Sequence, residues 1–541
     1  MNLQVLFVIV FRVSLTVAVA APTVTLDDGT FTGVAAGSIS KFRGIPFAQP
    51  PVRNLRFRFP QPLPPYVGTH QAVQYGPACP QQALSISSLP PGIAQSVGSI
   101  INTAFGPAVP SGEDCLTLNV IVPSNTTPQS KIPVVVWIYG GGFEAGYNSM
   151  YDGSEIVNRS IELGEPVIYV SMNYRVSGFG FLASREVKAA GVGNLGLQDQ
   201  RLSFQWIQKY ISAFGGDPAK VTIWGESAGA ISVALHMLYD GGNTGGLFRA
   251  GFMQSGSPIP VGPIEHGQKY YDFVVQKVGC STAADTLDCL RTVHYDALKA
   301  AFDATPGYTS YRSTVLTYLS RVDGVFLTDD PQRLVSQGKV ANIPFVTGDC
   351  DDEGTVFALS TLNITTDYQL EIYIKTIAFP NITDDDYQRL ARAYPSDVTQ
   401  GSPFDTGYRN ILTPQFKRIA ALIGDITFQA PRRHFLNQLS GKQDTWAFLS
   451  KREKMVPGLG SFHTTDLLNI YFGGELADYL IRFANNLNPN GPNTFFWPQY
   501  NTSTRSLLTF FDGLIPIALT QDTYRQEAMN VALNVTLANP M

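Results

Sequence analysis

The stretch Val221-Thr222-Ile223-Trp224-Gly225-Glu226-Ser227-Ala228-Gly229, followed by an apolar run from Ile231 to Leu238, decides the expected fold. Residues 221–224 are apolar or β-branched at consecutive positions, which is typical of a strand buried on both faces. The later run favours a helix. The serine lies in the pattern G-x-S-x-G, and glycines on either side allow a sharp strand-to-helix turn that leaves its hydroxyl exposed. The sequence therefore predicts a nucleophilic serine, Ser227, on a strand–turn–helix unit.

Similar apolar runs recur along the chain. They occupy residues 134–138, 166–170, 344–347 and 445–449. Helix-length segments such as 197–213 lie between them, and this alternation predicts an α/β protein with a large, mostly parallel central sheet flanked by helices. No repeat or low-complexity linker divides the chain, so we expect one domain over residues 21–541.

The composition supports a large buried interior and excludes one class of partner. Charged residues make up 15% of the 541 and apolar residues 44%, which argues against disorder. The formal net charge is −5, and no long basic run is present. Nucleic-acid binding is therefore not expected.

The N-terminus, residues 1–20, has the pattern of a secretory signal peptide. An apolar run begins at Val5, and Ala18-Val19-Ala20 forms an A-x-A cleavage site. Arg12 interrupts the run, and the alternative is a buried N-terminal strand. No later segment reaches the roughly 18 uncharged apolar residues of a spanning helix. We expect a secreted, extracellular protein without a transmembrane anchor.

Secretion gives meaning to two further features. Six N-x-[ST] sequons are glycosylation candidates: Asn125, Asn158, Asn363, Asn381, Asn501 and Asn534. Five cysteines in an exported protein predict two disulfides and one free thiol, and the residues alone leave the pairing open.

A charge-free stretch precedes the catalytic motifs. No Asp, Glu, Lys or Arg occurs from Phe59 to Gly112, and Ile93, Val97, Ile100 and Ile101 form one apolar stripe of a helix within it. One interpretation is a helix that faces the core. The other is a flap that covers an apolar site and meets lipid when it opens.

A second glycine-rich motif, Gly140-Gly141-Gly142, follows the strand at 134–138. Three glycines expose backbone N–H groups that suit a developing oxyanion, although a flexible turn would have the same composition. We expect the N–H groups of Gly141, Gly142 and Ala228 to form the oxyanion hole.

A serine nucleophile needs a base and an orienting acid downstream. His294 and His434 lie in charged, helix-like surroundings and are expected at the surface, whereas His463 lies in a loop after the strand at 445–449. The acid is expected in the cluster Asp349, Asp351, Asp352 and Glu353, which follows the strand at 344–347. Calcium binding or simple solvation are the alternatives for that cluster, and composition does not choose among its members.

These motifs, with others spread over the chain, carry a resemblance to a known family. The others are Phe42 to Ala48, Glu113-Asp114-Cys115-Leu116, Ser402-Pro403-Phe404, Thr413 to Arg418 and Gly460 to His463. The sequence resembles the type-B carboxylesterase/lipase family, in particular the fungal lipase and sterol-esterase branch of the Candida rugosa and Geotrichum lipases. The resemblance implies an α/β-hydrolase fold with Ser227 as nucleophile, Glu353 as acid and His463 as base.

The resemblance also implies the disulfides Cys79–Cys115 and Cys280–Cys289, and a lid over about residues 80–112, which favours the flap interpretation. Two positions depart from the family pattern. Arg53 stands where the family has glycine, and Cys350 enters the acid loop, which predicts sensitivity to thiol reagents.

Together these features predict a secreted serine ester hydrolase, similar to lipases and sterol esterases, that cleaves long-chain esters through an acyl-serine intermediate. No metal or cofactor is expected. The expected partners are ester substrates, a lipid–water interface reached through the lid, and a second copy bound through the open lid. Two alternatives stay open: a short-chain, aryl or pigment esterase, and a non-catalytic, cholinesterase-like binding protein.

Overall fold

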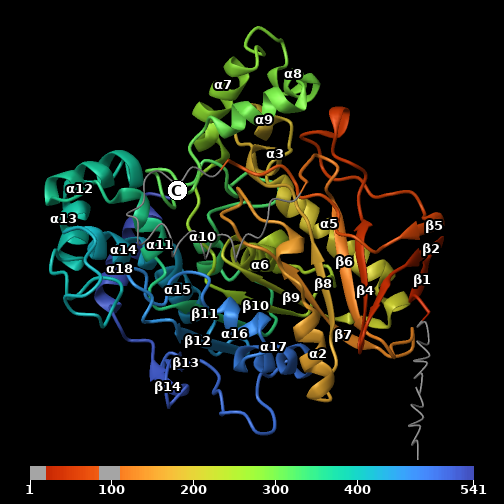
Figure 1. The fold of residues 1–541 in the computed structure, drawn as a ribbon. Coiled ribbons are helices and arrows are strands. Elements are labelled where there is room, and N and C mark those ends of the chain that lie inside the picture. Colours follow the sequence, from red (N-terminus) through yellow and green to blue (C-terminus); the bar gives the residue numbers. More distant parts are fainter. Residues whose placement is uncertain (1–19, 84–109, 541) are drawn as a thin grey trace, which may run out of the picture.

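A computed structural model describes residues 20–83 and 110–540, and one large sheet runs through it (Figure 1). In this part of the chain the sheet has 11 strands in the order β14-β13-β12-β11-β10-β9-β7-β8-β6-β4-β3. The strands are β3 (Val34–Ala36), β4 (Ile39–Pro46), β6 (Thr117–Pro123), β7 (Ile132–Ile138), β8 (Ile168–Met172), β9 (Gly216–Glu226), β10 (Ala250–Gln254), β11 (Phe345–Cys350), β12 (Thr445–Lys451), β13 (Ser506–Phe511) and β14 (Ile517–Gln521). A small separate sheet holds β1 (Thr23–Leu26), β2 (Asp28–Thr32) and β5 (Val67–Gln71).

The middle of the large sheet is parallel and its margins are antiparallel. Every pair from β8 through β7, β9, β10, β11 and β12 to β13 is parallel, while β6, β4, β3 and β14 join antiparallel. Every residue of β7 is buried, and so is every residue of β8. This burial agrees with consecutive apolar residues, since both faces of a covered parallel strand meet side chains.

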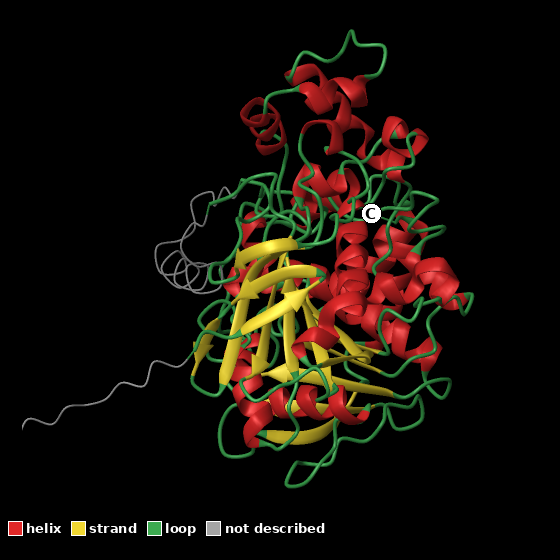
Figure 2. Ribbon diagram, turned by 90° about the vertical axis from the view of Figure 1, so that its right-hand side faces the viewer, coloured by secondary structure: helices red, strands yellow, loops and turns green. Residues whose placement is uncertain are grey.

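Helices cover both faces of this sheet (Figure 2). On one face, α6 (Ala228–Leu238) packs on β9 and β10, and it is joined by α10 (Pro331–Ser336) and α15 (Ala430–Leu439). α5 (Leu195–Tyr210) packs on β9. α2 (Ser154–Glu162) and α17 (Glu475–Asn486) contact each other and lie against β6, β8, β7 and β9, with α16 (Leu467–Tyr471) beside them.

A second, smaller apolar cluster lies among helices that follow the acid loop. Its elements are α11 (Thr355–Ala358), α12 (Asp367–Tyr373), α13 (Asp384–Ala393), α14 (Phe416–Gly424) and α18 (Gln526–Ala538). These helices form the left side of Figure 1. Three other helices project at the top of that view: α7 (Gln268–Lys277), α8 (Thr286–Thr292) and α9 (Tyr295–Asp303). Two further short α-helices are α3 (Ser177–Phe181) and α4 (Arg185–Ala189).

The predicted strands and the helices expected at 197–213 and 231–238 are confirmed, with boundaries that differ by up to five residues. The helix expected around residues 93–101 lies outside the described residues. The α/β class and the central sheet with its helical layers are confirmed as well, although the sheet is antiparallel at both margins. The signal peptide over residues 1–20 lies almost wholly outside the described residues, as does most of the lid segment 80–112. Both stay predictions, and so does the single domain over residues 21–541.

Candidate active site

Ser227 lies at the turn between β9 and α6, in a backbone conformation with φ 56° and ψ −127°. The two motif glycines are required by close approach. A Cβ on Gly229 would lie 1.9 Å from Ile138 O, and one on Gly225 would lie 2.4 Å from the Gly229 carbonyl carbon. Larger residues would force the turn apart, so the sequence holds the serine at the carboxyl end of the parallel strands.

The Gly140–Gly142 turn lies directly against this serine. A Cβ on Gly140 would be 2.8 Å from Ser227 Cβ, so the glycine turn and the serine turn are in contact. Gly141 and Gly142 have φ of 101° and 64°, a region that favours glycine. Ala228 is the first residue of α6, where N–H groups have no partner within the helix. The three proposed oxyanion donors thus belong to two adjoining turns.

The proposed acid and base follow two neighbouring strands of the sheet. Glu353 follows β11, and its Oε2 lies 2.5 Å from Nδ1 of His463, in the loop after β12. The main chain aligns the two loops, because Asp352 N donates to Ser461 O at 2.9 Å. Glu353 Oε1 accepts the N–H of Cys350 at 2.6 Å. Glu353 is therefore fixed on both oxygens, and one of them orients the imidazole.

Tertiary contacts distinguish the four carboxyl groups that the sequence left equivalent. Asp349 binds Arg432 Nε at 2.7 Å, and both Asp351 and Asp352 bind Lys454. Asp352 also accepts the N–H groups of Phe404 and Ser461. Among the four, only Glu353 contacts His463. The other three bind basic side chains instead.

The far side of the imidazole faces another buried carboxyl group. His463 Nε2 lies 3.2 Å from Oε1 of Glu226, the variable residue before the serine in the motif. Ser227 Oγ makes no hydrogen bond to a described residue in this state. The rings of Phe357 and Phe428 lie 5.1 Å and 4.6 Å from the imidazole centroid and shield it from water.

Burial dominates the electrostatics of the site. It lowers the pKa of His463 to about 4, so that the imidazole is neutral near pH 7 and able to accept a proton. Burial raises the pKa of Glu353, against the effect of hydrogen bonds from the Ser255 hydroxyl and the Cys350 amide, and the Nδ1–H group of His463 at 2.5 Å favours its carboxylate form. Burial also raises the pKa of Asp466 to about 6 and that of Glu226 well above its ordinary value, where the charges of Asp466 and Glu353 add to the shift.

Several residues of this cluster were missed by the sequence reasoning. The motif treats Glu226 as a variable position, and Asp466 has no motif of its own. The available signal for Asp466 was its place three residues after His463, as the one charged residue between Lys454 and Glu475. Phe357 and Phe428 belong to separate segments that only the fold brings to the imidazole.

The expectation for one other histidine was wrong. His294 is exposed, as expected, but His434 is buried on α15, where its ring contacts Ser336 and the carbonyl of Gln332. The charged residues next to His434 led to the prediction of a surface position. That prediction was wrong because Arg432 and Arg433 are themselves buried and bind Asp522. The partners of His294 and His434 are Asp296, Ser336 and Gln332, none of which belongs to the site described above.

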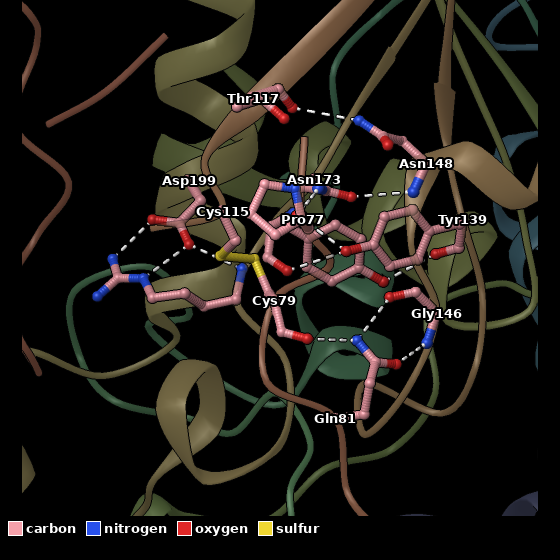
Figure 3. Close-up of a disulfide and its surroundings, with 12 residues drawn as sticks. Pro77, Cys79, Gln81, Cys115, Thr117, Tyr139, Gly146, Asn148, Asn173 and Asp199 are labelled. Atoms are coloured by element: carbon pink, nitrogen blue, oxygen red, sulfur yellow. Dashed lines mark hydrogen bonds and ion pairs between the residues drawn. A yellow bond between two sulfur atoms is a disulfide. The ribbon is translucent and has the colours of Figure 1, made fainter. Parts of the chain in front are cut away.

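The cysteines pair as Cys79–Cys115 and Cys280–Cys289, with S–S distances of 2.04 Å and 2.02 Å. Cys350 is free and fully buried, which is at odds with the expected sensitivity to thiol reagents. Figure 3 shows the first disulfide close to Gln81, whose side chain donates to Gly146 O and accepts from Gly146 N. This bond pair joins the segment after Cys79 to the loop that follows the glycine turn.

The sequons differ in how accessible they are. Asn158 is half-buried in α2 and its Oδ1 accepts the hydroxyl of Ser38 at 2.7 Å. The other five asparagines, Asn125, Asn363, Asn381, Asn501 and Asn534, are exposed. We therefore expect glycans at the exposed positions rather than at Asn158.

Over residues 20–83 and 110–540, no cluster of three or more His, Cys, Asp or Glu side chains has the arrangement of a metal site. In the same part of the chain, no helix is long and apolar enough to cross a membrane.

Known proteins resemble this chain over most of its length. A sequence profile described as "Carboxylesterase family" matches residues 20–528. Lipase 4 of Diutina rugosa is 48% identical over 510 residues, which are 91% of this chain and 92% of that protein. Secreted lipase 1 of Botryotinia fuckeliana is 44% identical over 520 residues, 92% of this chain and 91% of that protein. The crystal structure of Aspergillus niger EstA has a TM-score of 0.82 at 26% identity and covers 96% of this chain and 99% of its own.

Proposed function

The chain belongs to the carboxylesterase family, with the α/β-hydrolase fold, and we propose that it is a secreted serine ester hydrolase that cleaves lipid esters. The observation that carries the proposal is the convergence of three elements: a strained serine at the end of β9, the glycine turn against it, and the 2.5 Å contact between Glu353 and His463. This arrangement matches the roles that acyl transfer requires.

In the first step, Ser227 Oγ attacks the ester carbonyl carbon while Nε2 of His463 takes its proton. Glu353 holds the imidazole by Nδ1 and balances the positive charge that forms on the ring. The Nε2 atom faces Glu226 in the free protein. We infer that binding of an ester brings Nε2 and the serine hydroxyl together, as catalytic hydrogen bonds often tighten in the substrate complex.

The negative charge on the carbonyl oxygen is stabilised by the N–H groups of Gly141, Gly142 and Ala228. Loss of one such donor typically costs about 10²–10³ in rate. The alcohol leaves with the proton from His463, and an acyl group stays on Ser227. Water, deprotonated by the same imidazole, then releases the acid.

Two relatives suggest the substrate class and the location. The Diutina rugosa protein is named a lipase and the Botryotinia fuckeliana protein a secreted lipase. We propose long-chain esters of glycerol or sterols as substrates and an extracellular location. Contact with a lipid–water interface through the lid at about 80–112, and a homodimer through the open lid, stay predictions.

Hydrolysis of p-nitrophenyl esters from acetate to palmitate, together with a triolein emulsion, tests this function. We expect the highest kcat/KM at long chains and at least a thousandfold loss of kcat in Ser227→Ala. A maximum at acetate or butyrate without activity on the emulsion would instead identify a short-chain esterase. Wild type without any turnover would identify a non-catalytic binding protein, and unchanged turnover in Ser227→Ala would refute the mechanism.

A further inference from the structure

Glu144 is a buried carboxyl group that the mechanism above does not use. It follows the glycine turn by two residues, and none of its surface is exposed to solvent. Its partners are backbone groups: Oε2 accepts the N–H of Tyr308 at 2.7 Å, and Oε1 accepts the N–H of Tyr318 at 3.3 Å. No basic side chain of a described residue contacts it. A carboxyl group buried in this way is costly, so these hydrogen bonds must hold it in place.

The main chain of Glu144 is fixed equally firmly to the glycine turn. Its N–H donates to Gly141 O at 3.1 Å, and its carbonyl accepts the N–H of Gln82 at 2.7 Å. The backbone of Glu144 is therefore bonded to the glycine turn, while its carboxyl group binds the segment that contains Tyr308 and Tyr318.

That segment, residues 307–318, forms a wall beside the oxyanion turn. A Cβ placed on Gly142 would lie 3.6 Å from a side-chain carbon of Leu316 and 3.6 Å from one of Tyr308. These are ordinary van der Waals distances, so the two side chains stand against the glycine whose N–H is a proposed oxyanion donor. Gly142 and Leu316 are both half-buried, so each keeps accessible surface at this point.

We propose that Glu144 is a positioning residue that sets the spacing between the oxyanion glycines and the wall formed by Tyr308 and Leu316, and that this spacing selects the chain length of the ester. The inference rests on the proposed function, since it presumes that Gly142 binds the oxyanion. A long chain contacts more of the wall than a short one. Loosening the wall therefore weakens the binding of long chains more than that of short chains.

Glu144→Gln tests the idea with little change of shape. The amide keeps one acceptor, but its NH₂ group now faces a backbone N–H, so one of the two contacts becomes repulsive. We expect kcat/KM for p-nitrophenyl palmitate, divided by that for the butyrate, to fall by about tenfold, mainly through KM for the palmitate. A ratio that changes by less than fivefold, or in favour of palmitate, would overturn the proposal.

A matched control separates this effect from a general loss of stability. Asp330 is also buried, and its carboxyl group accepts the N–H groups of Val261, Gln332 and Arg333. Asp330→Asn removes the same kind of contact at a site outside the wall. We expect a lower melting temperature with an unchanged palmitate-to-butyrate ratio, and an equal change of that ratio in this control would count against a specific role of Glu144.

A double-mutant cycle with Leu316→Ala tests whether Glu144 acts through the wall. Leu316→Ala alone should lower the ratio, and adding Glu144→Gln should lower it further by less than twofold, because the wall is already altered. Multiplicative effects would contradict the mechanism. If Glu144→Gln does not fold, Glu144→Asp, which keeps the carboxyl group but retracts it by one methylene group, takes its place with the same expected shift. Failure of the proposed function itself would differ, since the wild type would then show no turnover at all, or a maximum at acetate or butyrate without activity on the triolein emulsion.

Discussion

Replacement of Glu353 by glutamine removes the charge that faces the imidazole of His463. The carboxylate oxygen lies 2.5 Å from Nδ1, and the side chain is fully buried. At this distance and an effective dielectric constant of about 20, a carboxylate stabilises an imidazolium by at most about 6–7 kcal/mol. Glutamine retains an oxygen that can orient the ring, so the loss should be smaller than this limit. We expect kcat to fall by about 10⁴, close to the effect of the equivalent change in serine protease triads.

The assay is steady-state hydrolysis of p-nitrophenyl butyrate at neutral pH, with folding checked by circular dichroism and melting temperature. KM should change little, because the carboxylate acts on the charge that forms in the transition state. A fall of kcat by less than about tenfold in a folded Glu353→Gln protein would refute the assigned role of Glu353.

Asp351→Asn is the matched control for this experiment. Asp351 is buried in the same loop, but its partners are Lys454 and Lys451 rather than the imidazole. Its replacement should lower the stability of the loop and leave kcat within a few-fold of the wild type. An equal loss of kcat in both variants would show that the acid loop as a whole, and not the contact to His463, is what activity requires.

Three further predictions concern pH, the backbone and the free thiol. Because burial lowers the pKa of His463 to about 4, the base stays neutral well below pH 6.5, and kcat/KM should decline only as pH falls toward that value; a midpoint at or above 6.5 in a pH–rate profile would contradict the assignment. Arg53 is exposed with φ 51°, so Arg53→Gly should raise the free energy of unfolding by about 1 kcal/mol in urea titrations, whereas Asn54→Gly, next to it, should lower it. Cys350 is fully buried and burial raises its pKa, so the native protein should neither react with a disulfide reagent nor lose activity. The urea-unfolded chain should expose one thiol, and rapid modification of the native protein would disprove this prediction.

Local sequence patterns were sufficient to predict the central strands of the sheet and the turn that carries Ser227. Runs such as Val134 to Ile138 are apolar at every position, so no choice of face is needed for their burial. The glycines at 225 and 229 are required by contacts within the same turn and with the neighbouring strand β7. The G-x-S-x-G spacing therefore indicates where a residue without a side chain is needed. β10 was missed because Ala250-Gly251-Phe252-Met253-Gln254 is short and contains no β-branched residue.

The lysine partners of Asp351 and Asp352 illustrate what local patterns lack. Lys454 is about a hundred positions away in sequence, and it reaches both carboxyl groups because β11 and β12 are neighbours in the sheet. The burial of His434 has the same origin, since Asp522 neutralises the arginines before it. Pairings of this kind depend on strand order, which adjacent residues do not encode.

The sequence by itself therefore determined the α/β architecture and placed the serine at its sharp turn, and the resemblance added Glu353 and His463 as the proposed acid and base. The tertiary structure alone decided which oxygen of Glu353 meets the imidazole, that Glu226 and Asp466 share the site, and that Glu144 joins the glycine turn to the segment beside it. The physical reason is that backbone conformation follows from near neighbours, whereas hydrogen-bond partners and burial follow from which distant segments the sheet places side by side.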